Sequence, residues 1–295
     1  MSGTYKATGI NLKSIPLGES DRIVTILTAE YGLVRAVAPG SRKQKSRLRG
    51  RVEPFVINEL LIARGRSLDK ITQAETRASY PGLSKNLGKL SIGQYWAEIV
   101  LALALSDRPQ EELYLLFTEH LQRLERIDRG SDRDLFSASI LAHLTHGIFH
   151  LLTLGGLSPR IQHCCLTGEA ISPVFRDPQW RVGMSFEAGG LLRLPLEVEQ
   201  SPNSSASVTI HTRLNALEIF LLQTLATPEL PRVEEAIALK LLPVDSPNSL
   251  KIGWLGVEKV LRNYTQYHLN KSIRSAALLD TLYRDGVGLS RGKVL

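Results

Sequence analysis

Residues 21–40 read DRIVTILTAEYGLVRAVAPG, and this stretch sets the pattern for the first quarter of the chain. Asp21–Ala29 is rich in Ile, Val and Thr, and Leu33–Ala38 follows it after the tight connection Glu30–Tyr31–Gly32. β-Branched residues in short runs, separated by turns that contain glycine, are typical of antiparallel strands. The stretch therefore predicts a β-hairpin that ends at Pro39–Gly40.

Similar runs lie on both sides of this hairpin. The strands that we expect are Thr4–Ser14, Asp21–Ala29, Leu33–Ala38, Val52–Ala63 and Asp69–Ala78, with Ile15–Ser20 as a turn. Short strands in so small a segment must protect their edges from pairing with other chains, and a closed barrel does this. The five-stranded form of such a barrel is the OB-fold. The sequence therefore predicts an OB-fold over residues 1–80.

The periodicity becomes helical after a break at Tyr80–Pro81–Gly82, where apolar residues between Ile92 and Leu103 recur on one helix face. The further helices that we expect are Glu111–Arg126, Leu135–Leu154 with Asp134 as its N-cap, Thr212–Leu225, Arg232–Leu242 and Lys251–Leu282. Glycines and prolines interrupt residues 155–210, which predicts an irregular insert of turns and short strands.

The predicted fold class is therefore α+β. An N-terminal five-stranded OB-fold barrel at 1–80 is followed by a mostly helical domain at 81–285, which contains the insert, and by a flexible tail at 286–295.

The excess positive charge lies in the predicted barrel. Residues 1–80 hold 14 Lys and Arg against 7 Asp and Glu, whereas residues 81–295 hold 22 of each, so the net charge of +7 belongs to the first quarter of the chain. A basic domain on a neutral body indicates a polyanionic partner, with nucleic acid first and an anionic membrane surface second. We see no apolar run long enough to span a bilayer, and we expect no membrane partner.

The strongest local feature is Ser41–Arg51, SRKQKSRLRGR, which joins the third and fourth strands and holds six basic residues. A flexible basic loop can follow a phosphate backbone and release its counterions. Cations on strands two and three, and around the loop between strands four and five, would extend it over the usual OB ligand face. The predicted nucleic-acid-binding residues are Arg22, Arg35, Arg42, Lys43, Lys45, Arg47, Arg49, Arg51, Arg64, Arg66 and Lys70.

Aromatic side chains, on which bases could stack, are scarce in this domain. They are Tyr5, Tyr31, Phe55 and Tyr80, and we expect Phe55 to pack inside the barrel. Binding should then depend on phosphates, show little sequence preference, and accept both single and double strands.

Five stretches, taken in order, resemble the RecO family of DNA-repair proteins. They are GINLKSIPLGESDRIVTILTAEYGLVRAVAPGSRK at 9–43, RVEPFVINELLIARGRSLDKITQAE at 51–75, LGGLSPRIQHCCLTGE at 154–169, SFEAGGLL at 185–192 and LRNYTQYHLNKSIRSAALL at 261–279. The resemblance implies a non-enzymatic recombination mediator that binds and anneals DNA strands. It also implies a RecR-type partner and contact with the C-terminal tail of single-strand-binding protein. The family would help to load the RecA recombinase on DNA strands that are covered by single-strand-binding protein.

The chain departs from the family at a metal site. Many members carry Cys-x-x-Cys twice, a four-thiolate zinc site. Here Cys164 stands at the first position, Thr167 replaces the second cysteine, and no second pair follows Gly190. His163, Cys164 and Cys165 are too few for a structural zinc. We therefore expect a zinc-ribbon-like insert that has lost its metal, no cofactor, and packing through Phe175, Trp180 and Phe186.

Two groups of residues in predicted helices can each be interpreted either as core packing or as a binding site. His143, His146 and His150 share a helix face and could suggest a zinc site, but we expect packed histidines. A second set has helical spacing and is expected in the core: Trp254, Val257, Val260, Leu261 and Tyr264. The alternative for that set is a groove for an acidic tail, near Arg262, Lys271 or Arg274.

We expect no enzyme, because the sequence has neither a GxxxxGK[ST] phosphate loop nor a GxSxG elbow. The residues leave open an RNA-binding OB protein and a protein-interaction scaffold. The adjacent Cys164 and Cys165 form no disulfide framework, and residues 1–9 lack the apolar core of a signal peptide. We therefore expect a cytoplasmic, nucleoid-associated protein.

Overall fold

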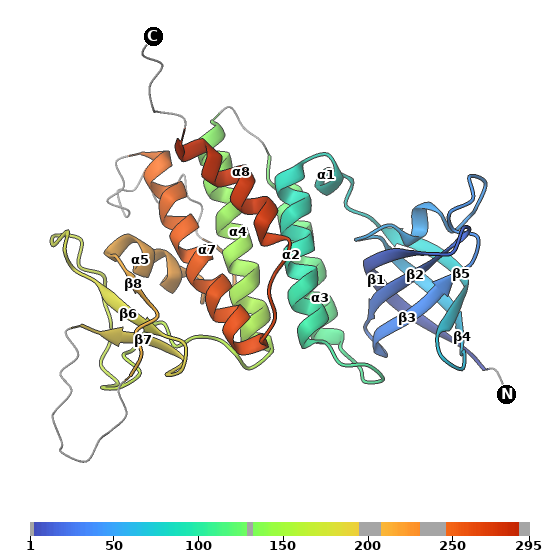
Figure 1. The fold of residues 1–295 in the computed structure, drawn as a ribbon, viewed down its shortest axis with the longest axis horizontal. Helices are drawn as coiled ribbons and strands as arrows, with labels where there is room; N and C mark the ends of the chain where they lie inside the picture. The colour runs from blue at the N-terminus through green and yellow to red at the C-terminus, as the bar shows by residue number, and fades with distance from the viewer. Residues whose placement is uncertain (1–2, 129–131, 195–207, 231–245, 289–295) are drawn as a thin grey trace, which may run out of the picture. The chain divides into compact units, whose positions relative to one another are not determined.

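The computed structural model describes residues 3–128, 132–194, 208–230 and 246–288, and gives side chains as far as residue 283. The chain forms two compact units, shown in Figure 1. Unit 1 is Met1–Arg126 together with Ile273–Leu295, and unit 2 is Ile127–Ser272. Unit 1 is therefore built from both ends of the chain.

A closed five-stranded barrel forms the N-terminal part of unit 1, as predicted (Figure 1). Its strands are β1 (Thr4–Leu17), β2 (Asp21–Thr28), β3 (Gly32–Ala38), β4 (Ile57–Ala63) and β5 (Asp69–Ala78), in the order β1-β2-β3-β5-β4. Neighbouring strands are antiparallel except β3 and β5, which pair in parallel. The barrel interior is aliphatic and includes Val24, Ile26, Val34, Ala36, Leu60, Ile62 and Ile71.

Strand β1 is longer than predicted and takes in Ile15–Leu17, which the sequence-based prediction placed in a turn. It pairs with β4 only as far as Ile10, so its later residues have one unpaired edge. Proline is tolerated on such an edge, because no ladder hydrogen bond needs its missing N–H, and Pro16 continues the strand. A register shift between Asn11 and Lys13 precedes this extension.

Strand β4 is shorter than predicted, because a 3-10 turn at Gly50–Val52 precedes it. Phe55, in the connection, adopts a φ of 65°. The prediction that Phe55 packs inside the barrel is wrong. Its ring lies 6.4 Å from that of Phe117, and a Cβ added to Gly93 would come within 3.0 Å of it. Phe55 therefore packs against helices of unit 1.

The helices of unit 1 are α1 (Pro81–Ser84), α2 (Leu87–Leu103), α3 (Glu111–Arg126) and α8 (Ala276–Gly288). Glu98, on α2, accepts hydrogen bonds from the backbone N–H groups of Arg274 (2.7 Å) and Ser275 (3.0 Å) just before α8 begins. Glu98 therefore holds the start of α8 on α2.

The predicted helix Lys251–Leu282 is in fact two helices. Helix α7 (Pro247–Leu269) ends at Asn270, whose φ of 48° is left-handed. Asparagine tolerates this conformation at a helix C-terminus better than most residues. The chain then begins α8 in the other unit.

Unit 2 contains α4 (Arg133–Leu154), α5 (Ala216–Thr224) and α7, with a three-stranded sheet of β6 (Val182–Ser185), β7 (Gly190–Arg193) and β8 (Thr212–Leu214). Helix α4 is long and apolar enough to cross a membrane by length and composition, which the sequence-based prediction missed. However, 72% of its apolar window is buried inside the protein. Because α4 packs against α7, its apolar character is that of a core helix.

Two further predictions in unit 2 are corrected. Asp132, rather than Asp134, caps α4, because its carboxylate accepts from the N–H groups of Asp134 and Leu135. Asp134 instead pairs with Lys251 at 3.0 Å. The helix predicted from Thr212 begins only at Ala216. Its start is fixed by a capping box that Asn215 and Glu218 form. Predicted helix 232–242 and most of the predicted tail 286–295 lie outside the described residues.

The close packing of Gly32 yields a stability prediction. Gly32 has a φ of 66°, and a Cβ there would overlap the carbonyl oxygen of Leu105 and lie 2.7 Å from that of Arg108. Gly18 has a similar φ of 59° and nothing within 4 Å. Gly18→Ala should cost only the left-handed backbone energy, about 1–2 kcal/mol. Gly32→Ala should cost about 1–3 kcal/mol more through overpacking.

Urea unfolding of both variants measures this difference in the free energy of unfolding. Equal losses in the two variants would show that the 105–108 segment does not press on Gly32.

Candidate nucleic-acid interface

The basic loop, residues 41–51, begins in a network centred on Asp21. The Asp21 carboxylate accepts hydrogen bonds from the Ser20 hydroxyl (2.6 Å) and the Gly40 N–H (2.8 Å). Arg42 then donates its backbone N–H to the Ser20 carbonyl at 2.9 Å, and its guanidinium donates to the carbonyl of Gly18. The start of the loop is thus tied to the β1–β2 turn.

The end of the basic loop is held by two buried asparagines. The side-chain amides of Asn11 and Asn58 both donate to the Arg51 carbonyl, at 2.7 and 2.8 Å. Asn11 also donates to the Glu53 carbonyl at 2.9 Å. Both asparagines are almost inaccessible to solvent, so these bonds are formed where an unpaired carbonyl would be costly.

Between its two ends the basic loop folds as a series of turns, rather than as the flexible segment that the sequence suggested. Backbone hydrogen bonds join Lys43 to Gly40 (3.0 Å), Ser46 to Lys43 (3.1 Å) and Arg49 to Ser46 (3.3 Å). Its cations Lys43, Lys45, Arg47 and Arg49 are exposed. The loop therefore presents its positive charges from a formed backbone.

One group of the predicted cations gathers where β2, β3 and β5 meet the start of the basic loop. Strand pairing places Lys70 opposite Val37 on β3. Both Lys43 and Lys70 lie close enough to Asp21 to lower the pKa of its carboxyl group. Arg35 is exposed on β3. It shares a row across the sheet with Thr25 and Lys13.

Lys13 was missed by the sequence-based prediction, although its position matches that of Arg35. The register shift at Asn11–Lys13 breaks the alternation along β1, so the face that Lys13 occupies cannot be read by counting from the start of the strand. The pairing of Lys13 with Thr25 on β2 shows which face Lys13 occupies, and the sequence alone does not give this pairing.

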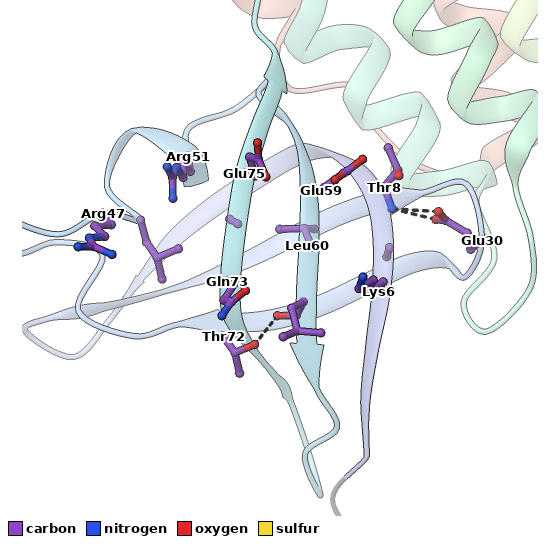
Figure 2. A pocket seen from close by; sticks show the side chains of 14 residues that line it. Lys6, Thr8, Glu30, Arg47, Arg51, Glu59, Leu60, Thr72, Gln73 and Glu75 are labelled. Atoms are coloured by element: carbon purple, nitrogen blue, oxygen red, sulfur yellow. Dashed lines mark hydrogen bonds between the residues drawn. The ribbon is translucent and has the colours of Figure 1, made fainter.

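A second surface lies on the other side of the basic loop, over β1, β4 and β5. It is a hollow of about 980 Å³ whose lining includes Arg47 and Arg51 from the loop. Figure 2 shows these two arginines at one side of the hollow and Glu59 and Glu75 on the strands beneath. The lining cations Lys6, Arg47 and Arg51 are matched by the acids Glu30, Glu59 and Glu75. The hollow is therefore charge-balanced.

The other predicted residues occupy separate positions. Arg22 forms an ion pair with Glu53 at 3.1 Å and is mostly buried, which offsets its charge. Arg64 lies over the ring of Tyr5, 5.3 Å from its centroid. Arg66 is exposed in the β4–β5 loop. The predicted set thus divides among the basic loop, the exposed cations beside it, the balanced hollow and one ion pair at the surface.

The segment around Cys164 cannot supply four thiolates, because Cys164 and Cys165 are the two cysteines of the chain. The Cys164 thiol is buried, and its sulfur accepts the backbone N–H of Arg193 at 3.4 Å. Burial works against the thiolate, but hydrogen bonds from the backbone at Arg193 and Thr167 outweigh it and lower the pKa of Cys164. Among the described residues, the Cys164 sulfur is therefore held by hydrogen bonds from its neighbours.

The insert packs only in part as predicted, because Phe186 is buried but Phe175 is exposed. Phe186 is buried and stacks on His211, with ring centroids 4.2 Å apart, and meets Tyr264 edge-on at 5.8 Å. Trp180 is half-buried. Phe175 is 39% exposed, although its ring lies 6.2 Å from that of Phe220. Phe186 is therefore the main anchor of the insert.

The helical histidines hydrogen-bond backbone carbonyls, and the apolar face of α7 is buried. His143 hydrogen-bonds the Ser139 carbonyl (2.9 Å), and His146 hydrogen-bonds that of Thr227 (2.9 Å). His150 contacts the same Thr227 carbonyl at 3.2 Å. The α7 residues that could have formed a groove are buried in the core: Trp254, Val257, Val260, Leu261 and Tyr264.

Comparison with known proteins assigns this barrel and helical arrangement to a family. Residues 1–80 match the family model described as "Recombination protein O N terminal", and residues 84–277 match "Recombination protein O C terminal". The chain belongs to the RecO family. This RecO-family chain is 49% identical to the "DNA repair protein RecO" of Nostoc sp. strain PCC 7120, over 96% of this chain and 97% of that protein. It is 50% identical to the protein of the same name from Trichodesmium erythraeum, over 95% of both chains.

Membership of the RecO family gives the chain a role in DNA repair and recombination. The matched family and the relatives carry no enzymatic activity in their names.

The Asp21 network at the start of the basic loop predicts a pH dependence. The Ser20 hydroxyl first, then the Gly40 N–H and the charges of Lys43 and Lys70, lower the pKa of Asp21 below its ordinary value of 3.8. A lowered folded-state pKa gives stability that is present above the ordinary value and is lost as pH falls through the folded value. Asp21→Asn should therefore be less stable than the wild type at neutral pH, with the gap closing in strong acid.

Urea midpoints at neutral pH and at about pH 2 measure this gap. Glu19→Gln, an exposed acid in the same turn, is the control and should keep the wild-type dependence on pH. A gap that is the same at both pH values would contradict the role assigned to the Asp21 charge.

Proposed function

We propose that unit 1 binds DNA through the exposed cations of the basic loop and of the adjoining end of the barrel, without sequence preference. The observation that carries this proposal is the formed loop, which exposes Lys43, Lys45, Arg47 and Arg49 and contains no acid. Cations fixed on a folded backbone lose little freedom when they meet phosphates, and they release condensed counterions as they bind.

Annealing of complementary strands follows from the same charge. Two DNA backbones repel each other, and cations that neutralise the phosphates of one strand lower the repulsion felt by the second. Contacts to phosphates carry no sequence information, so the bound strand can shift until its bases pair. No catalytic residue or nucleotide hydrolysis is needed for this step.

The mediator role completes the proposal. We infer that the chain works with a RecR-type partner, contacts the C-terminal tail of single-strand-binding protein, and so helps the RecA recombinase to load in the cytoplasm, at the nucleoid. The support is the family match along both parts of the chain. Since Trp254 and Leu261 are buried, these two side chains would not form the tail site.

The insert is proposed to fold without zinc. The support is that the chain has two cysteines, Cys164 and Cys165, and that the insert is anchored by the aromatic packing of Phe186. Treatment of the purified protein with EDTA should leave its thermal midpoint unchanged. Metal analysis that finds stoichiometric zinc, together with a lowered midpoint after chelation, would contradict this.

The binding surface is tested by two variants with equal charge loss. Replacement of Lys43, Lys45, Arg47 and Arg49 by Ala should weaken binding of a labelled single strand on the order of tenfold or more at low salt, because each phosphate without a protein cation keeps its counterion. The log–log salt slope should flatten by ~0.7 for each phosphate that the variant no longer neutralises. The measurement is fluorescence anisotropy at several salt concentrations.

The matched control replaces four exposed cations of unit 2 by Ala: Arg176, Arg213, Lys259 and Lys271. It should keep the wild-type slope and affinity. Equal weakening in both variants would mean that net charge, and not the basic loop, determines binding. No binding by the wild type at low salt would overturn the proposed function itself.

A further inference from the structure

The outer face of the barrel carries a row of aliphatic side chains on three neighbouring strands. Ile15 on β1 pairs with Ile23 on β2, and Ile23 pairs with Val37 on β3. Val24, Ile26, Ala36 and Ala38 belong to the barrel core, so alternation along the strands places Ile23 and Val37 on the outside. Ile15 shares their face because direct cross-strand partners lie on one side of a sheet. These three residues are called the aliphatic platform.

In the aliphatic platform Ile15 is exposed and Ile23 and Val37 are half-buried, whereas the next aliphatic row on the same strands is more deeply covered. Leu27 pairs with Ile10 and Leu33, and both Ile10 and Leu27 are fully buried. In that region the segment after α2 reaches the barrel, where Leu33 donates its N–H to the Leu105 carbonyl at 2.9 Å. Ile15, by contrast, is 38% exposed. Packing within unit 1 therefore covers the platform only in part.

Cations border the aliphatic platform on two sides. Lys13 and Arg35 occupy the adjacent row, in register with Thr25. Lys70 continues the platform row itself, beside Val37 on β5. The nearby acid Asp21 accepts hydrogen bonds from Ser20 and Gly40, and Asp69 accepts from Tyr5 and Gly65. The cations Lys13, Arg35 and Lys70 therefore outnumber these two acids and border a surface whose centre is apolar.

We propose that the aliphatic platform receives the unpaired bases of single-stranded DNA, while Lys13, Arg35 and Lys70 hold its phosphates. The proposal rests on the proposed function and deepens it, because it names the form of DNA that this face prefers. In a duplex the base faces are stacked on one another, so they cannot cover an aliphatic surface. An unpaired base offers an apolar face that can cover exposed aliphatic side chains.

The dimensions of the aliphatic platform suit this ligand better than a protein partner. Strands lie about 4.8 Å apart, so a row over three strands is roughly 10 Å long. That length is comparable to the two or three bases that sheet surfaces of other RNA- and DNA-binding domains receive. A stable protein interface buries about 800 Å² on each side. Three aliphatic side chains bordered by cations do not approach that area.

The test uses Ile15→Thr, Ile23→Thr and Val37→Thr combined in one full-length variant. Threonine keeps the β-branched shape that strands favour, but it places a hydroxyl on the platform. Three probes of equal length are compared by anisotropy: an oligothymidine strand, an abasic strand with the same phosphates, and a duplex. The wild type should bind oligothymidine about fivefold to tenfold more tightly than the abasic strand.

The variant should lose this preference and bind both strands with the affinity that the wild type shows for the abasic strand. Its duplex affinity and salt slope should stay unchanged. The matched control replaces three exposed leucines elsewhere in unit 1 by Thr: Leu87, Leu105 and Leu115. That control should retain the wild-type preference, and circular dichroism with thermal melting shows that both variants are folded.

Three results would overturn the inference. They are a wild type that binds abasic and base-bearing strands equally, a variant that keeps the preference, and a variant that weakens duplex binding as much as single-strand binding. In each case DNA binding that still depends on the basic loop leaves the proposed function standing. Loss of all binding by the wild type is instead the failure of the proposed function.

Discussion

The barrel closes through one short parallel pairing, in which Ala36 lies opposite Asp69 and Val37 opposite Lys70. The end of β3 leads into the basic loop, and the start of β5 follows the β4–β5 loop. The pairing therefore brings two cation-bearing loops to one end of the barrel. The β1–β2 turn joins them there, because Pro16 pairs with Arg22 and Arg22 with Ala38. Without this closure the same residues would lie on unrelated edges of an open sheet.

Charge balance then distinguishes the two sides of the basic loop. On one side, Arg47 and Arg51 meet a hollow whose acids equal its cations in number, and one of these acids, Glu59, also pairs with Arg77. On the other side, cations border an apolar row, and the neighbouring carboxylates of Asp21 and Asp69 accept hydrogen bonds from neutral donors. One segment of sequence thus serves two surfaces with different electrostatics.

Much of the fold could be predicted from local patterns. The strands around residues 21–38, strand Asp69–Ala78 and helix Glu111–Arg126 follow from residue type and periodicity alone. The errors occur where a distant contact decides the structure. Pro16 continues a strand because β4 is absent from its other edge. Glu98 holds the backbone of Arg274, 176 residues later in the sequence, just before α8 begins.

Prediction of the candidate site likewise succeeded where local sequence patterns decide and failed where distant contacts decide. Composition located the excess charge in residues 1–80 and its densest run in residues 41–51. Composition could not show that Arg22 is paired with Glu53, nor that Lys13 faces the same way as Arg35. Which side of a strand a residue occupies depends on bulges and register, and these are set by partner strands. The division of the basic residues among several surfaces was therefore visible only in three dimensions.

The central claim is that the barrel, and not the helical unit, holds the DNA strand. Ultraviolet crosslinking of the full chain to a single strand rich in thymine, followed by mass spectrometry of the linked peptides, tests this directly. The crosslinks should fall in residues 13–51 and 64–70, on β1–β3, the basic loop and the β4–β5 loop. Crosslinks confined to residues 127–272 would contradict the claim.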